Sequence, residues 1–262
     1  MKLRAFAILA AACCLAGCTL PNSTTSSPTQ GNGSLNGNWQ LVVGGFPVGV
    51  VFATTNGAVS GLAIMQAPVP QYCLAGVPCG FPEVFLGGNL TGTVDESGNF
   101  SLTASSPYPS TLTLTGQSSG GQLTGTFSLT VGTSTDQGAI SGTSIQPIDG
   151  TYTGVVTSSV TGASVNITAV LTQGSTPGSN GALPLSGTVN FGGYSCFSST
   201  TVSTGSAVLG EGYGLTLVPT NTSISVGAEG GVSPDAKTLT FDYAVFGGGC
   251  AFDDGTGTLT LQ

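Results

Sequence analysis

The sequence predicts an all-β protein of two tandem antiparallel repeats, each an up-and-down barrel or a sandwich, after a signal peptide and a flexible tether. Three observations support this. Apolar and polar residues alternate along many short runs, which is the pattern of strands with one buried face. Related segments recur in the two halves of the chain. No stretch after the signal has the period of an amphipathic helix.

Residues 1–17 have the three parts of a secretory signal: two basic residues, a short apolar run and a small-residue cleavage site. The apolar run is shorter than the roughly 20 residues that cross a bilayer. The site reads Leu15-Ala16-Gly17-Cys18 and resembles the lipobox of bacterial lipoproteins. The resemblance implies cleavage before Cys18 and lipidation of that cysteine, including a palmitate-type acyl chain. The alternative is an ordinary signal peptide that ends in cysteine.

The lipobox resemblance also implies a location. The chain would be held in the cell envelope by its lipid, and Thr19 after the cysteine implies the outer membrane in a Gram-negative cell. Residues 18–34 are mainly Ser, Thr, Asn, Gly and Pro, so they bury too little apolar surface to offset the entropy of ordering. We expect them to form a flexible linker between the lipid and the folded part.

Charge excludes several classes of partner. Without the signal, Lys237 is the only basic side chain against eleven carboxylates, which gives a net charge of −10. Such a chain has no means of neutralising phosphates, so nucleic acid and anionic lipid headgroups are excluded as principal partners. Hydrophobic residues make up 39% of the chain, which is enough for a core.

Four cysteines remain after the signal and the lipidated position: Cys73, Cys79, Cys196 and Cys250. An even number in an exported protein favours disulfides. Three pairings are open, and we favour Cys73–Cys79 with Cys196–Cys250. Zinc is the competing interpretation, but the chain has no histidine, and the spacing of the first two cysteines is wider than that of a zinc knuckle.

The repeat divides the folded part into residues 35–146 and residues 147–262. Residues 35–43 match residues 148–156 at an offset of 113, with aromatic Trp39 and Tyr152 in the same place. A second match joins Leu90-Thr-Gly-Thr-Val94 to Leu185-Ser-Gly-Thr-Val189 at an offset of 95.

The two offsets differ by 18 residues, which predicts extra sequence between the motifs of the first copy. Residues 66–83 have this length and contain Cys73 and Cys79, so they are interpreted as an inserted, disulfide-closed loop. The loop also contains Tyr72 and Phe81 among four prolines. Because binding residues often lie on loops of a rigid scaffold, these two aromatics are the candidate recognition residues, or else a lid over one barrel end.

Five runs show the strand alternation most clearly, and about eight runs are counted in each copy. Their inward residues are Phe46/Val48/Val50/Phe52, Phe100/Leu102/Ala104, Leu123/Phe127/Leu129/Val131, Val165/Ile167/Ala169/Leu171 and Leu239/Phe241/Tyr243/Val245.

A pattern apolar-x-Gly-x-apolar recurs on these runs, with glycine in phase with the inward residues; Gly92, Gly125 and Gly187 are examples. An inward glycine allows a sharp bend or the close approach of another backbone, as closed barrels require. The pattern therefore favours two barrels over two sandwiches. One larger sheet shared by both copies stays open.

Gly37-Asn38-Trp39 opens the first copy, and Gly150-Thr151-Tyr152 opens the second. The first triplet is similar to the Gly-x-Trp of lipocalins and related calycin barrels. The resemblance implies a barrel whose interior holds a small apolar ligand. An aromatic residue that closes one barrel end explains Trp39 equally well.

The usual catalytic and metal-binding residues are missing or weakly placed, so no catalytic residue, metal or cofactor is predicted. The absence of histidine removes nucleophiles activated by His. Lys237 follows Pro234 and Asp235, which are typical of a hairpin turn. Gly210–Gly214 lacks the helix and lysine of a phosphate loop. The acidic residues are interpreted as solvated turns rather than as calcium or acid–base sites: Asp95-Glu96, Glu211, Glu229, Asp242 and Asp253-Asp254.

The expected function is that of a non-enzymatic, membrane-anchored lipoprotein serving as a structural or interaction module, and its partner, a protein or a small apolar ligand, stays open. One alternative is a calycin-like carrier of a small apolar ligand, which would need a cavity among the inward Phe, Leu and Val residues. The other is a glycan-binding or glycan-active module, which would need exposed aromatics beside a carboxylate.

Overall fold

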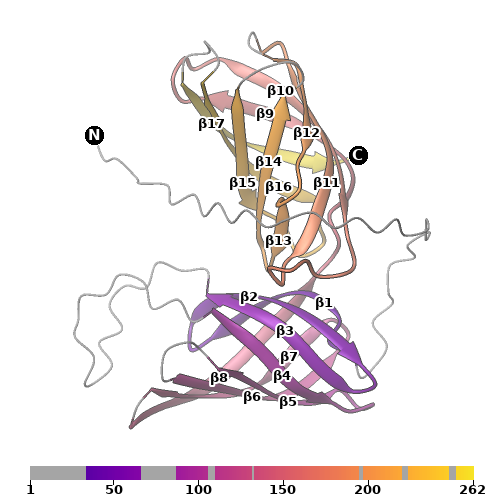
Figure 1. Cartoon of the computed structure of the whole chain (residues 1–262), viewed down its shortest axis with the longest axis vertical. Helices are drawn as coiled ribbons and strands as arrows, with labels where there is room; N and C mark the ends of the chain where they lie inside the picture. The colour runs from indigo at the N-terminus through magenta and orange to yellow at the C-terminus, as the bar shows by residue number, and fades with distance from the viewer. Residues whose placement is uncertain are drawn as a thin grey trace.

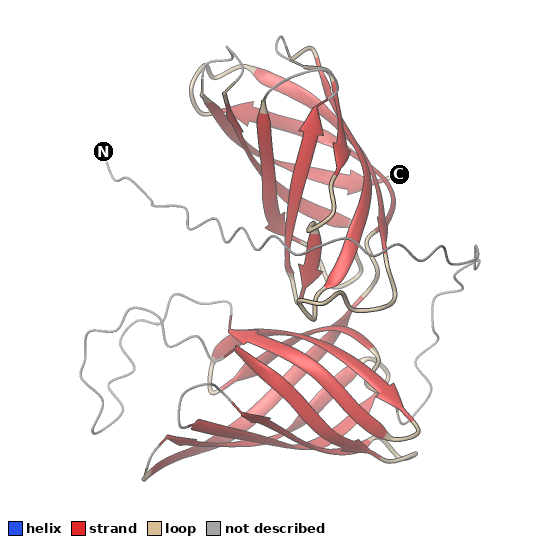
Figure 2. Cartoon of the chain, in the orientation of Figure 1, coloured by secondary structure: helices blue, strands red, loops and turns tan. Residues whose placement is uncertain are grey.

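The structure is a computed structural model that describes residues 34–65, 87–105, 110–131, 133–194, 197–219, 224–247 and 252–262. Strands and turns make up all of this part of the chain, and it contains no helix (Figure 2). No helix long and apolar enough to cross a membrane is therefore found in it. The prediction of an all-β protein is confirmed.

The first eight strands form a closed antiparallel barrel in which each strand pairs with the next (Figure 1). Pairing of the first strand with the eighth closes it, with Val42 opposite Ser141. The strands are β1 (Gly37–Val43), β2 (Phe46–Thr55), β3 (Ala58–Met65), β4 (Gly87–Val94), β5 (Asn99–Ser105), β6 (Ser110–Ser119), β7 (Gln122–Val131) and β8 (Ser134–Ile145).

The other nine strands form a second barrel, closed by the pairing of β9 with both β10 and β17 and of β10 with β11. The short strands β12 and β13 both lie between β11 and β14, so they share one position and the barrel has eight positions. The strands are β9 (Asp149–Ser158), β10 (Ser164–Gln173), β11 (Leu183–Gly192), β12 (Ser199–Val202), β13 (Ala207–Leu209), β14 (Gly212–Pro219), β15 (Ser225–Gly231), β16 (Thr238–Phe246) and β17 (Asp253–Leu261).

The structure thus has two separate barrels, not one sheet shared by both copies. Each opens on its matched aromatic residue, and both side chains are fully buried. The Trp39 indole N–H donates to the Leu35 carbonyl at 2.8 Å, and the Tyr152 hydroxyl donates to the Ala236 carbonyl at 2.8 Å. The predicted internal repeat is confirmed by this shared meander.

Inward glycines mark places where neighbouring backbones approach closely, as expected. A Cβ on Gly125 of β7 would lie 2.0 Å from the Thr115 carbonyl oxygen on β6, and one on Gly187 of β11 would lie 1.9 Å from the Val170 carbonyl on β10. No real Cβ tolerates such a distance, so these positions require glycine. The glycine pattern therefore belongs to barrel closure.

The second repeat match, at an offset of 95, is wrong in its details. It pairs β4, the fourth strand of its barrel, with β11, the third strand of the other. Gly61 on β3 is the true counterpart of Gly187, because a Cβ there would also meet the preceding strand, 2.5 Å from the Val51 carbonyl. The five-residue pattern recurs on several strands that approach closely, so it does not identify one strand.

The 18-residue difference therefore does not measure an insertion. The connection between β3 and β4 still covers residues 66–86, whereas its counterpart between β11 and β12 covers only 193–198. The predicted inserted loop, residues 66–83, lies outside the described residues.

The barrels contact each other through the β13–β14 turn, which lies against β1. The buried Asn38 side chain donates to the Gly210 carbonyl at 2.8 Å and accepts the Gly210 N–H at 2.6 Å. Beside it, the Gln40 side-chain oxygen accepts the Glu211 N–H at 2.9 Å. Val51, which is only 1% exposed, packs in the second barrel's core cluster although its strand belongs to the first.

Candidate functional site

Most of the predicted site residues lie outside the described part of the chain. These are the lipidation residue Cys18, the loop aromatics Tyr72 and Phe81, and the four cysteines assigned to disulfides, namely Cys73, Cys79, Cys196 and Cys250. Their roles stay predictions. Two contacts join the neighbourhoods of the last two cysteines: the Tyr194 ring lies 6.4 Å from Tyr243, and the Tyr194 hydroxyl hydrogen-bonds to Asp253.

Both barrel interiors are filled with side chains. Trp39 packs edge-on against Phe52 in the first barrel, with ring centroids 6.4 Å apart. In the second barrel, Phe191 packs edge-on against Phe241 and Tyr243, at 6.3 and 5.7 Å. The alternating residues that would line a calycin-type cavity form these cores instead. The filled interior counts against a carrier of an apolar ligand.

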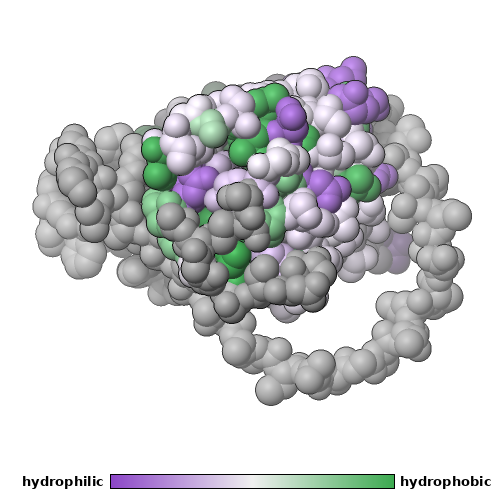
Figure 3. Space-filling view, turned by 90° about the horizontal axis from the view of Figure 1, so that it is seen from above, coloured by the Kyte–Doolittle hydropathy of each residue, from purple (hydrophilic) through white to green (hydrophobic). Residues whose placement is uncertain are grey.

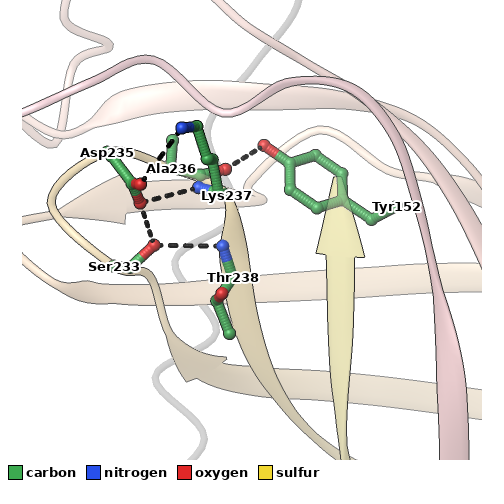
Figure 4. A network of polar contacts seen from close by, with 6 residues as sticks. All are labelled: Tyr152, Ser233, Asp235, Ala236, Lys237 and Thr238. Atoms are coloured by element: carbon green, nitrogen blue, oxygen red, sulfur yellow. Dashed lines mark hydrogen bonds and ion pairs between the residues drawn. The ribbon is translucent and has the colours of Figure 1, made fainter. Parts of the chain in front are cut away.

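Lys237 lies in the turn between β15 and β16. The polar groups of this turn bind one another (Figure 4). The Ser233 hydroxyl donates to Asp235 at 2.7 Å and accepts the Thr238 N–H at 3.0 Å. The hydrogen bond from Ser233 is the main reason why the pKa of Asp235 is held below its usual value. The Lys237 ammonium lies 3.7 Å from Asp235, and both side chains are well exposed. The geometry is that of a stabilised turn.

Asp95 has a similar role between β4 and β5. Its carboxylate accepts the Ser97 and Asn99 N–H groups at 2.9 Å and the Asn99 side-chain amide at 2.8 Å. The hydrogen bond from the Asn99 side chain contributes most to lowering the pKa of Asp95. Throughout the described ranges, no three potential metal-ligating side chains come together.

Asp253, by contrast, is buried at the start of β17. It accepts the Ser158 hydroxyl at 2.6 Å and the Tyr243 hydroxyl at 2.9 Å. Burial raises the pKa of Tyr194 to about 12, and the carboxylate of Asp253 beside that hydroxyl adds to this effect. No buried side-chain polar atom of the described residues lacks a hydrogen-bond partner. We therefore interpret the cluster around Asp253 as one that stabilises this end of the second barrel.

Three further carboxylates, those of Glu211, Glu229 and Asp242, lie on the outside of the second barrel. Glu229 on β15 is directly opposite Asp242 on β16, and both side chains are exposed. Asp242 also contributes to the strongly raised pKa of the buried Tyr213, whose main cause is burial. Glu211, Glu229 and Asp242 line a groove of about 720 Å³ that runs from the inter-barrel contact over β13–β16.

Two exposed aromatics lie at the other end of the same strands. Phe246 and Phe252 are 45% and 53% exposed, and their ring centroids are 5.4 Å apart. Asp254 follows two positions after Phe252 and lies on β17, opposite Ala244 of β16. Sequence reasoning missed this pair, although Phe246 follows the inward Val245 and thus falls at an outward position of the alternation. The pair meets the condition of exposed aromatics beside a carboxylate.

Comparison with known proteins adds little. No family model matches the sequence, and no curated protein matches it. A solved structure with some similarity is that of a DUF3598-family protein of unknown function from Nostoc punctiforme PCC 73102. It is 10% identical to this chain, covers 86% of this chain and 94% of its own, and has a TM-score of 0.30.

Proposed function

We propose that the chain is a lipid-anchored envelope protein that acts by binding, through the outer surface of its barrels, and not by catalysis. The anchor is the lipid on Cys18, which is supported by the Leu15-Ala16-Gly17-Cys18 motif at the end of a signal peptide. Residues 19–34 would then let the barrels stand off from the bilayer.

The observation that carries this proposal is the filling of both interiors. A carrier holds its ligand in a cavity that buries most of the ligand's surface. Here Trp39, Phe52, Phe191 and Phe241 occupy that space with almost no exposure. Partner binding is therefore assigned to the outside of the barrels, where the groove and the exposed aromatics are found.

We also infer a Cys196–Cys250 disulfide from the flanking contacts. Tyr194 and Phe197 are next to one cysteine along the chain, Asp253 is near the other, and both groups lie around Tyr243. Peptide mapping without reductant tests this pairing.

Two measurements test the proposed function. The variant Cys18→Ser, expressed in the native host, should lose palmitate labelling and membrane partitioning, while the unaltered protein keeps both. A fluorescent fatty acid should show no saturable, stoichiometric binding to the purified chain. Unchanged labelling of the variant contradicts the anchor, and stoichiometric fatty-acid uptake would support a carrier instead.

A further inference from the structure

We propose that the outer face of β14–β17 is a docking surface for a basic segment of a partner protein, one that carries apolar residues beside its lysines or arginines. This inference rests on the proposed function, because it names the partner class of a surface that acts by binding. We call this surface the acidic face. It consists of Glu229, Asp242 and Asp254, the groove near the first barrel, and the Phe246–Phe252 pair.

The floor of the acidic face is formed by glycines. Gly214, Glu229 and Asp242 lie in one row across β14, β15 and β16. A Cβ added to Gly214 or to Gly227 would meet nothing within 4 Å, so the space above both glycines is open. The carboxylates of Glu229 and Asp242 therefore project beside open glycine positions. A partner segment can contact both these carboxylates and the strand backbone at the glycines.

The carboxylates are not neutralised within the described part of the chain. Like charges directly opposite each other on neighbouring strands are destabilising, and Glu229 and Asp242 are in that position. Among the described residues, the one ion pair joins Lys237 to Asp235, in the turn before β16. A cation supplied from outside would remove the repulsion, so binding and relief of this unfavourable pair are coupled.

Apolar surface lies at both ends of the carboxylates. The groove is lined by the half-buried Ile64 of the first barrel and Leu209 of the second, next to Glu211, and the buried Ala182 and Val208 also border it. At the far end lies the Phe246–Phe252 pair, and aromatic faces attract the cations of lysine and arginine. Figure 3 views the molecule from that end and shows apolar patches between weakly polar and hydrophilic residues.

The negative charge of the chain determines which partner fits the acidic face. A second copy of the chain without its signal would bring one lysine and eleven carboxylates, so it would be repelled. Nucleic acid and anionic lipid are repelled for the same reason. A basic protein segment with apolar neighbours matches both the carboxylates and the apolar ends, and opposite potentials favour such an encounter.

The test uses the full lipidated chain in uncharged detergent micelles. The probe is a fluorophore-labelled octapeptide that alternates lysine and valine, and its binding is measured by anisotropy at fixed salt. The variant Glu229→Gln/Asp242→Asn should weaken binding about tenfold, since it removes two exposed ion pairs. The variant should also melt at a higher temperature than the unaltered chain, because it removes the like-charge pair.

The control is Glu96→Gln/Asp136→Asn, which removes the same charge from the first barrel and should leave binding within about twofold. An equal loss in the control would show attraction by net charge only and would overturn the proposal. So would equal binding of a glutamate–valine octapeptide. Full displacement of the peptide by spermine would show that any polycation binds this face, and displacement by chitotetraose would show that the face binds a glycan. Either result would overturn the proposal.

The outcomes separate the two proposals. If the chain partitions with membranes but binds the lysine–valine and glutamate–valine peptides equally, the docking inference is wrong and the proposed anchoring stands. Loss of anchoring, by contrast, contradicts the proposed function and leaves the peptide result valid for the folded part.

Discussion

The two barrels have the same eight-position meander but present different outer faces. In the first, the outward positions of β6 and β7 carry hydroxyls, and Thr115 and Thr126 hydrogen-bond across the strands at 3.2 Å. In the second, the corresponding outside carries Glu229 opposite Asp242 and the exposed Phe246–Phe252 pair. The inward pattern preserves the fold, while the outward positions are free to acquire a binding surface.

Their interiors also differ. The first barrel brings β6 and β7 close together through glycine, with Gly116 directly opposite Gly125. The second adds a buried polar cluster, in which Asp253 accepts hydroxyls from Ser158 and Tyr243. Both barrels thus depend on close backbone packing at glycines, and the second depends in addition on buried side-chain hydrogen bonds.

The largest effect is expected for Gly125→Ala. Its new Cβ would lie 2.0 Å from the Thr115 carbonyl and 2.7 Å from the Gly116 Cα, so strands β6 and β7 must separate. The free energy of unfolding should fall by about 3 kcal/mol. Urea denaturation followed by the fluorescence of Trp39, the only tryptophan, measures it.

Gly227→Ala in the second barrel is the matched control. Nothing lies within 4 Å of its added Cβ, so stability should change by less than about 1 kcal/mol. Similar losses in both variants would show that close strand approach is not the reason for glycine at position 125.

The second effect is that of Asp253→Ala. The substitution leaves the buried Tyr243 hydroxyl without its acceptor, which should destabilise the second barrel by about 2–3 kcal/mol. Asp254→Ala, one residue later and facing outward, should cost less than about 0.5 kcal/mol. Denaturation followed by tyrosine absorbance compares the two. Equal losses would show that the polar cluster does not stabilise the barrel.

These contrasts show how far the sequence predicts the molecule. Period-two alternation identified the strands, because one face of each strand is buried, and the Gly-x-aromatic triplets marked where each barrel starts. The alternation does not predict the register in which neighbouring strands pair. That Glu229 lies opposite Asp242 depends on how β15 and β16 are joined, and the burial of Asn38 depends on a turn 172 residues away. The first feature belongs to the candidate site and the second to the contact between the barrels, so neither was predicted.

The third prediction concerns the contact between the barrels. Asn38→Ala removes both hydrogen bonds to Gly210, and the contact should weaken by about 1–2 kcal/mol. Thermal unfolding should then separate into two transitions, one seen by Trp39 and the other by Tyr152, Tyr194, Tyr213 and Tyr243, four of the six tyrosines. Asn190→Ala, at an exposed position of β11, should leave the curves unchanged. Coincident curves in the Asn38 variant would mean that apolar contacts such as Val51 suffice.

The smallest effect expected for a single side chain is the loss of stability when a buried tyrosine ionises at alkaline pH. This loss should differ between the two barrels of the unaltered chain. The described part of the first barrel has no tyrosine, whereas the second contains Tyr152, Tyr194, Tyr213 and Tyr243. Burial is the main cause that raises the pKa of all four above 10. A folded pKa above the unfolded one means that the unfolded chain ionises first as pH rises.

The stability contributed by these neutral tyrosines is therefore complete below pH 10 and is lost progressively above it, up to about pH 12 for Tyr194. Each of the four tyrosines begins to lose its contribution as pH rises through 10. The midpoint seen by tyrosine absorbance should fall between pH 9 and 11, while the one seen by Trp39 changes less. Tyr213→Phe should reduce this slope, because one ionising group is removed. Equal slopes for both probes, with and without Tyr213, would contradict the assignment of the effect to the second barrel.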